Sequence, residues 1–547
     1  MKRRHWLFLI MNALFLMNSI LSYGEEVKLT IHVDSAGSLP SLIDSSLMYQ
    51  VTDLTLSGNL NGTDLRFIRG MAGFNWFGDS TPGILSKLDM KDVTIHASDM
   101  PYRIDVFDDW TSHSYTEDNK IGDAMFSDFS NITSIILPTS VNAIGNNSFT
   151  NCSGLKYIEL PDAIKSIGIN AFKNCSALDS IILPDSLRLL SYAAFQGCTG
   201  LKTVTIPSGI TKISGESFAD CTGLTSLQLP EGVTTIGGLA FMGNTGLTTV
   251  QLPNSLLSIE GSAFFKCSGL TSIRIPGSVV FIGKSVFRDC TQMDSIIVDE
   301  SNAYYCSVDG ILFNKTKTEL VSFPNQHAST YTIPNGVVSI YGGAFAGCTE
   351  LKSVIVSASV KTLGEESFRG CSILDSVFLS DSLNSIESYA FSHCASLLSI
   401  TIPEQVTVIG NYAFWWCTGL IALHIKQATP LNLNSYTFYQ VNKDTCKLYV
   451  PAGSASLYQS ASVWSDFKYI LEESPLAPEP ILYDDITVLG RDGLIMVSTT
   501  KTARLQVYDL CGRSVYKNTL EGSSEIVVDK GVYIVSINGR PIKIMVM

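Results

Sequence analysis

A phenylalanine recurs at a fixed interval along most of this 547-residue chain. It returns every 23 residues from Phe149 to Phe287 and, after one longer interval, every 23 residues again from Phe345 to Phe414. The positions are Phe149, Phe172, Phe195, Phe218, Phe241, Phe264, Phe287, Phe345, Phe368, Phe391 and Phe414. A fixed period of about 20–50 residues indicates a solenoid, in which each coil buries its apolar side chains only against neighbouring coils. We therefore expect function on the surface of a ladder rather than in an enclosed pocket.

Each repeat has the same internal pattern, L-x-x-I-x-I-P-x-x-(V/I)-x-x-I-G-x-x-(A/S)-F-x-x-C-x-x-L. The first Leu and the two Ile match the strand of a leucine-rich repeat, with these side chains inward and the intervening ones outward. The proline ends the strand because it cannot donate to the ladder. A glycine then marks the corner where the chain turns back, at Gly145, Gly168, Gly237, Gly283, Gly364 and Gly410.

These repeats resemble the BspA-like leucine-rich repeats of bacterial surface proteins. The longer interval, at residues 304–324, resembles the extended repeat of that family, in which Asp309-Gly310 would turn a small hairpin. The resemblance covers about residues 126–471. It implies a mainly β, right-handed leucine-rich repeat solenoid with 23-residue coils, in an exported surface protein of a Gram-negative bacterium.

The N-terminus has the pattern of a secretory signal peptide over residues 1–24. Lys2–Arg4 precede an apolar run, Trp6–Leu21. The alternative is a membrane anchor, but the run is shorter than the roughly 20 residues that a spanning helix needs, and it contains Asn12 and Asn18. We expect an exported protein with no transmembrane segment after cleavage. Its formal net charge of −13 argues against nucleic acid as a partner.

Residues 25–125 do not keep the period and are expected to form an irregular N-terminal cap. Such a cap is needed because the first regular coil would otherwise expose its apolar face. Val51–Leu60 and Leu85–Ile95 are predicted as strands. Thr63–Met71 is predicted as a short helix, capped by Asn61 or by its own first residue.

The C-terminal end contains three further segments. Leu448–Phe467 resembles the closing segment of the same family, so the solenoid with its C-terminal cap is expected to reach residue 471. Residues 472–481 are Pro-rich and predicted as a linker. Residues 482–547 resemble the small β-sandwich at the C-terminus of type IX secretion substrates, on the elements D-L-x-G-R at Asp509–Arg513 and G-V-Y-I-V at Gly531–Val535.

Ten of the 13 cysteines occupy one position of the repeat, and Asn244 fills that position once. They are Cys152, Cys175, Cys198, Cys221, Cys267, Cys290, Cys348, Cys371, Cys394 and Cys417. Coils stacked about 4.8 Å apart would permit disulfides by distance, but equivalent side chains in a solenoid point in parallel. We predict a buried column of free thiols instead. No metal or cofactor site is predicted, since no C-x-x-C or paired histidine is present.

The sequence offers no catalytic signature. The seven histidines are scattered, and neither H-E-x-x-H nor G-x-S-x-G occurs. Glu159 and Asp179 could form a carboxylate pair across neighbouring coils. A secreted carbohydrate-active enzyme with a cryptic site therefore stays as an alternative, but we predict that the protein is not an enzyme.

The outward strand positions are more informative about binding. The middle one forms a hydroxyl stripe: Tyr157, Ser180, Thr203, Ser226, Thr249, Ser272, Ser295, Ser353, Ser376 and Ser399. Such residues suit solvated strands and could simply satisfy one another along the stack. The alternative is a weakly charged docking surface, on which aromatic residues and arginine tend to carry interface energy. Its candidate anchors are Tyr157, Arg274, Phe378 and His424.

Trp415 and Trp416 follow Phe414, the last of the recurring phenylalanines, which we call the anchor phenylalanines. The two residues after an anchor phenylalanine are usually small or polar. Trp415 and Trp416 are expected either to tuck under the C-terminal cap or to form an exposed aromatic contact site.

We predict an adhesion or binding protein that contacts host matrix proteins, partner-cell proteins or glycans through its strand face. Many shallow contacts repeated across coils would add up, with avidity where several copies share a surface. The expected location is the cell surface, outer-membrane-associated or extracellular. A structural envelope protein without an external ligand is the remaining alternative.

Overall fold

The computed structural model of the chain describes residues 26–106, 111–473 and most of 481–546. The predicted signal peptide, residues 474–480 of the predicted linker and residues 510–513 of the D-L-x-G-R element lie outside the described residues. The chain divides into two compact units, which are described separately. The first comprises Met1–Leu397, Val406–Gly419 and Tyr436–Val441, and the second comprises Leu398–Gln405, Leu420–Ser435 and Asn442–Met547.

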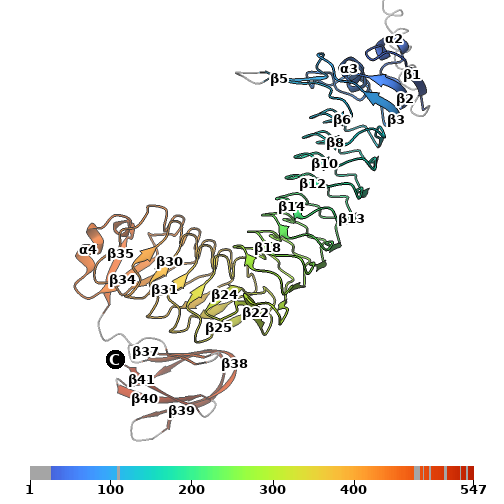
Figure 1. Cartoon of the computed structure of the whole chain (residues 1–547). Helices are drawn as coiled ribbons and strands as arrows, with labels where there is room; N and C mark the ends of the chain where they lie inside the picture. Colours follow the sequence, from blue (N-terminus) through green and yellow to red (C-terminus); the bar gives the residue numbers. More distant parts are fainter. Residues whose placement is uncertain are drawn as a thin grey trace, which may run out of the picture. The chain divides into compact units, whose positions relative to one another are not determined.

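The first unit is a ladder of parallel coils (Figure 1). Each regular coil contributes one strand of three or four residues and one of two residues, which we call the long-strand and short-strand columns. Equivalent strands pair in parallel one repeat apart, as Ser180 does with Thr203 and Ser166 with Leu189. The predicted period is therefore confirmed as the register of the ladder.

The long-strand column of this unit consists of β7 (Ser134–Ile136), β9 (Tyr157–Glu159), β11 (Ser180–Ile182), β13 (Thr203–Thr205), β15 (Ser226–Gln228), β17 (Thr249–Gln251), β19 (Ser272–Ile275), β21 (Ser295–Val298), β25 (Thr330–Thr332), β27 (Ser353–Ile355) and β29 (Ser376–Phe378). The short-strand column consists of β6 (Lys120–Ile121), β8 (Ala143–Ile144), β10 (Ser166–Ile167), β12 (Leu189–Leu190), β14 (Lys212–Ile213), β16 (Thr235–Ile236), β18 (Ser258–Ile259), β20 (Phe281–Ile282), β26 (Ser339–Ile340), β28 (Thr362–Leu363), β30 (Ser385–Ile386) and β32 (Val408–Ile409).

The anchor phenylalanines form two stacks in the core, one from Phe149 to Phe287 and one from Phe345 to Phe414. Phe149, Phe172 and Phe195 are fully buried. Their ring centroids follow one another at 5.0 and 5.1 Å, with interplanar angles of 3° and 2°. Because the ring spacing is close to the rise between paired strands, each coil adds one ring to the stack without distorting the ladder.

The predicted column of buried free thiols is confirmed, and it has a polar role as well. Every described cysteine is free. The Cys198 thiol donates to the carbonyl oxygen of Phe172 at 3.1 Å, and the contact repeats along the ladder. Burial raises the pKa of Cys198 to about 12, so this thiol is protonated at neutral pH and unreactive.

Asn244 replaces a thiol in this column and leaves one polar atom unsatisfied. Its side-chain Nδ2 donates to the carbonyl oxygens of Phe218 and Phe241 at 2.9 and 2.7 Å, while its buried Oδ1 has no partner in the described chain. We expect Asn244→Cys to raise the free energy of unfolding by about 1 kcal/mol, because it removes that oxygen and keeps a donor toward Phe218. Urea unfolding would measure the change, with Cys198→Asn as the reverse substitution that should lower stability. A lower midpoint for Asn244→Cys would mean that the two amide hydrogen bonds outweigh the unsatisfied oxygen.

The turn around each anchor phenylalanine contains two residues in the left-handed conformation. The leading position lies two residues before the phenylalanine, and the trailing position lies two residues after it. These pairs are Ala124 and Asp128, Asn147 and Asn151, Asn170 and Asn174, Ala193 and Gly197, Glu216 and Asp220, Leu239 and Gly243, Ser262 and Lys266, Ser285 and Asp289, Gly343 and Gly347, Glu366 and Gly370, Tyr389 and His393, and Tyr412 and Trp416. The corner glycines of the repeat do not supply this conformation. Gly168 is required for a different reason, since a Cβ there would lie 2.6 Å from the carbonyl carbon of Gly145 on the preceding coil.

The N-terminal cap continues the same parallel sheet, in the order β1-β2-β3-β7-β9. The predicted strands and helix are confirmed as β2 (Asp53–Leu60), β3 (Lys87–Ile95) and α3 (Gly62–Met71), whose N-cap is Asn61. The sequence reading missed four further elements: β1 (Lys28–Val33), α2 (Leu39–Leu42), β4 (Arg103–Val106) and β5 (Thr111–Ser114). The cap is therefore built from coils of unequal length on the register of the ladder.

The extended repeat contains the predicted hairpin. β22 (Tyr305–Val308) and β23 (Ile311–Asn314) pair antiparallel, and Asp309 and Gly310 form the two-residue turn with φ of 51° and 81°. Positive φ at both turn residues matches the right-handed twist of the two strands. β24 (Glu319–Ser322) then pairs in parallel with β26, which returns the chain to the short-strand column.

The second unit closes with the expected C-terminal cap. β31 (Ser399–Ile402), β33 (Ala422–Ile425), β34 (Lys447–Pro451) and β35 (Tyr469–Glu473) pair in parallel, and α4 (Ala455–Ser460) and the 3-10 helix η1 (Trp464–Asp466) lie between the last two. The hydroxyl of Tyr458 donates to the carbonyl of Gln427 at 2.9 Å, and Nε1 of Trp464 donates to that of Leu431 at 2.7 Å. Since β35 reaches Glu473, the first two residues of the predicted linker belong to this strand.

The C-terminal segment forms one antiparallel sheet in the order β36-β37-β38-β40-β41, with β39 also paired to β38. The strands are β36 (Ile481–Tyr483), β37 (Ile486–Arg491), β38 (Leu494–Asp509), β39 (Ser514–Val527), β40 (Gly531–Ile537) and β41 (Arg540–Val546). Val488, Ile495, Leu505 and Val535 belong to its buried cluster. The all-β expectation holds for this segment, while the sandwich arrangement stays a prediction.

Candidate binding surfaces

The outward side chains of the long-strand column form what we call the strand face. The hydroxyl stripe lies on it as predicted, with Ser180 exposed beside the buried Ile181 of the same strand. The hydroxyls do not satisfy one another along the stack, however. Ser180 donates to Asp179 at 3.2 Å, and Ser295 and Ser376 bond in the same way to the aspartates that precede them. In these three coils the stripe hydroxyl is therefore satisfied by the residue that precedes it.

Two of the predicted anchors are exposed on this face, and each is paired locally. Tyr157 on β9 is 51% exposed, and its hydroxyl donates to Glu159 at 3.2 Å. Arg274 on β19 is also exposed, and its Nη2 donates to Asp299 at 3.1 Å. These bonds hold both side chains in place without burying them, so both surfaces are available to a partner.

The other two predicted anchors are less available. Phe378 on β29 is half-buried. His424 on β33 stacks on Tyr449, with the ring centroids 4.5 Å apart, and its Nδ1 bonds to Glu473. The His424 side chain is thus held by neighbours in the C-terminal cap. Tyr157 on β9 and Arg274 on β19 are about 24 Å apart at one strand spacing per coil, so these two anchors do not share a pocket.

Ile182 is the most exposed large apolar side chain of the strand face, and the sequence reading did not select it. It is 84% exposed on β11. Ile297 on β21 follows with 43%. The signal was present in the sequence, because isoleucine fills an outward position that holds Thr205 and Gln228 in the next coils.

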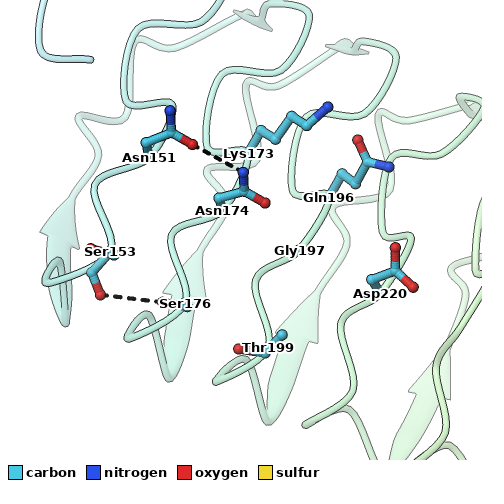
Figure 2. A pocket seen from close by; sticks show the side chains of 9 residues that line it. All are labelled: Asn151, Ser153, Lys173, Asn174, Ser176, Gln196, Gly197, Thr199 and Asp220. Carbon is cyan, nitrogen blue, oxygen red and sulfur yellow. Dashed lines mark hydrogen bonds between the residues drawn. The ribbon is translucent and has the colours of Figure 1, made fainter. Parts of the chain in front are cut away.

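A shallow polar groove of about 500 Å³ crosses the turns that follow the anchor phenylalanines, and the sequence reading did not anticipate it either (Figure 2). It is lined by Asn151, Ser153, Lys173, Asn174, Ser176, Gln196, Gly197, Thr199 and Asp220. Nδ2 of Asn174 donates to Oδ1 of Asn151 at 3.0 Å, one coil away. The groove therefore offers a mixed polar surface whose amides already bond along the ladder.

Trp415 and Trp416 pack against aromatic residues of the preceding coil. Trp415 is half-buried and lies edge-to-face against Tyr389 and His393, with ring centroids 6.1 and 4.8 Å apart. Trp416 stacks on His393 at 5.8 Å and is 44% exposed. Of the two expectations for this pair, an exposed aromatic contact site is the one that agrees with the exposure of Trp416.

The described residues offer no group of three side chains that could hold a metal ion. The candidate carboxylate pair is Glu159 and Asp179. Glu159 accepts a hydrogen bond from the hydroxyl of Tyr157, and Asp179 accepts one from the hydroxyl of Ser180. No helix within the described ranges is long and apolar enough to cross a bilayer.

The model of the BspA type leucine rich repeat region matches the chain in six copies, over residues 119–242, 212–331 and 316–445. The matched segments together span more than half of the chain. The chain belongs to the BspA-type leucine-rich repeat family. This BspA-type assignment confirms the resemblance that the repeats showed. The mainly β solenoid predicted from that resemblance is confirmed as well.

Solved structures similar to this BspA-type chain include several bacterial repeat proteins. A leucine rich cell surface protein from Faecalibacterium prausnitzii A2-165 is 29% identical, with a TM-score of 0.46, over 67% of this chain and 86% of that one. A leucine-rich repeat protein from Bacteroides ovatus ATCC 8483 is 27% identical, with a TM-score of 0.37, over 63% and 90%. The pneumococcal vaccine antigen PcpA is 22% identical, with a TM-score of 0.41, over 63% and 80%. No curated protein matches the sequence.

Proposed function

We propose that this BspA-type protein is exported to the bacterial surface and binds partner proteins, without catalysis, through its strand face. The observation that carries the proposal is the exposure of Tyr157 and Ile182, at 51% and 84%, on adjacent coils among small hydroxyl side chains. Exposed aromatic and aliphatic side chains of this kind supply the central contacts of protein interfaces. The signal-peptide pattern of residues 1–24 supports export.

The partner would be held by contacts spread over several coils. Arg274 extends the surface to β19, where its bond to Asp299 fixes the guanidinium while leaving it in solvent. Because the exposed side chains are spread over several coils, affinity would depend on the number of coils that a partner covers and on how many copies share one cell surface.

The full-length triple variant Tyr157→Ala, Ile182→Ser and Arg274→Ala is expected to bind immobilised matrix proteins or partner cells about 100-fold more weakly than the natural protein, because each truncation removes roughly 1 kcal/mol of contact energy. Surface plasmon resonance would measure the loss. Lys173→Ala, in the polar groove, is the control and should bind normally. Unchanged binding of the triple variant to every partner would refute the strand face as the contact site.

Protease treatment of intact cells tests the location on which this proposal depends. Release of peptides from residues 126–471 before lysis would support a surface protein. Recovery only after lysis would favour the structural envelope role. Turnover of a polysaccharide that is lost in Glu159→Gln or Asp179→Asn would instead favour the enzyme alternative.

A further inference from the structure

Two adjacent coils differ from the others at the left-handed positions around their anchor phenylalanines. In the described coils from Phe126 to Phe287, and again at Phe345 and Phe368, the leading and trailing positions hold no aromatic residue. In the next two coils all four are aromatic: Tyr389, His393, Tyr412 and Trp416, with φ of 59°, 62°, 58° and 61°. A bulky side chain in this conformation is unfavourable, whereas Asn, Asp and Gly tolerate it. The turn itself therefore does not account for these four rings.

The four rings assemble with neighbours into one cluster, which we call the aromatic platform. Tyr389, Tyr412 and Tyr436 stack in a row, with centroids 4.9 and 5.2 Å apart and interplanar angles of 6° and 14°. Trp415 stands edge-on against Tyr412 at 5.7 Å, and its buried Nε1 has no hydrogen-bond partner in the described chain. The platform thus combines stacked ring surface with a buried N–H group that no described residue satisfies.

The exposed part of the platform is too small for a stable protein interface. Trp416, Tyr436 and Tyr439 are 44%, 48% and 46% exposed. Half of an aromatic side chain corresponds to roughly 100 Å², so the three offer about 300 Å². A standard protein interface covers about 800 Å² per partner. A small ligand of one or two rings fits the available surface better.

A charged side chain lies against the platform, and it is already paired. Arg369 lies over Tyr389, 5.4 Å from the ring centre, and is paired with Glu366. Burial, followed by the charges of Arg369 and Arg288, lowers the pKa of His393 from its ordinary value, so the imidazole is neutral at pH 7. A neutral ligand needs no counter-charge at this site, whereas an anionic ligand would find no free positive charge to bind on Arg369 or His393.

We propose that the aromatic platform is a second binding site, separate from the strand face, and that its ligand is a neutral oligosaccharide. A sugar ring presents C–H groups on its face and hydroxyls at its rim. Its face can pack on the Trp416 or Tyr436 ring while its hydroxyls bond to polar groups at the rim, such as the phenolic hydroxyl of the exposed Tyr439. Contact with a ligand would explain why aromatic residues are kept at these positions despite the backbone strain. Strained residues are commonly found at functional sites.

The test uses the full-length protein with cellohexaose, maltohexaose, laminarihexaose, mannohexaose and chitohexaose as probes in isothermal titration calorimetry. At least one should bind with a dissociation constant below millimolar, and Trp416→Asn should weaken that binding at least tenfold. Because Asn tolerates the left-handed conformation, Trp416→Asn should melt at the same temperature as the natural protein or higher. Loss of binding in this variant would therefore not reflect unfolding.

Lys266→Asn is the matched control, because it also introduces asparagine at a trailing position, in another coil. It should leave saccharide binding unchanged. The strand-face triple variant should also bind the saccharide normally, which separates this site from the proposed function. The proposal is overturned if no probe binds, or if Trp416→Asn binds as the natural protein does. Self-association that Trp416→Asn abolishes, without saccharide binding, would instead identify a second copy of the chain as the occupant.

Discussion

Phe195→Ala should lower the free energy of unfolding by about 4 kcal/mol, as expected when a fully buried aromatic ring is deleted from a packed core. Phe195 is fully buried and stacks between Phe172 and Phe218, at 5.1 and 5.5 Å. The substitution removes the ring, both stacked contacts and the volume that they fill. Because each coil is supported only by its neighbours, the damage should be concentrated around the cavity rather than spread evenly along the ladder.

Urea unfolding combined with hydrogen exchange would measure this effect. Faster exchange should be largest in the coils of Phe172, Phe195 and Phe218. Ile182→Ala is the control, since it truncates an apolar side chain that is 84% exposed, and its effect should stay within about 0.5 kcal/mol. A loss below about 1 kcal/mol for Phe195→Ala would show that the stack is not the main source of stability.

The regular part of the fold was predictable because each coil reproduces the environment of the one before it. A single inference about which side of the strand is buried therefore applied to all coils, and it placed Ile181 inward and Ser180 outward correctly. The buried thiols followed from the same reasoning, because cysteines such as Cys198 occupy one position of the repeat, which Asn244 fills once. The Asp309-Gly310 hairpin was predictable from local turn chemistry alone.

The left-handed positions were not predictable, because no single residue type marks them. The leading position holds Asn147, Ala193, Glu216 and Leu239 in different coils, so a shared backbone conformation leaves no shared letter in the sequence. Tertiary context imposes this conformation through the stacking of coils. The significance of Trp416 therefore emerges only when its backbone is compared with equivalent positions.

The candidate sites were predictable only in part, because exposure and pairing depend on distant residues. Tyr157 and Arg274 are exposed as expected. His424 is bonded to Glu473, which lies 49 residues further along the chain. Ile182 was overlooked because an apolar side chain in an outward slot resembles ordinary variation until its exposure is measured.

The N-terminal cap depends on one buried carboxylate, and Asp64→Ala should lower its stability by about 3 kcal/mol. Asp64 is fully buried and accepts hydrogen bonds from the backbone N–H groups of Gly37, Leu39 and Asn61 at 2.6, 2.9 and 2.8 Å. It thereby joins the start of α2 to the start of α3.

In Asp64→Ala, three backbone donors lose a charged acceptor, and the buried N–H of Leu39 is left with a desolvation penalty, while those of Gly37 and Asn61 are only partly buried. Asp64→Asn should lose about half as much, since its amide oxygen still accepts while its NH₂ group faces a donor. Hydrogen exchange should show the loss in β1, α2 and α3 (residues 28–71), with the coils beyond Phe195 unaffected. Equal stability of Asp64→Ala and the natural protein would mean that water enters and satisfies these donors, and that the cap is held by its apolar contacts alone.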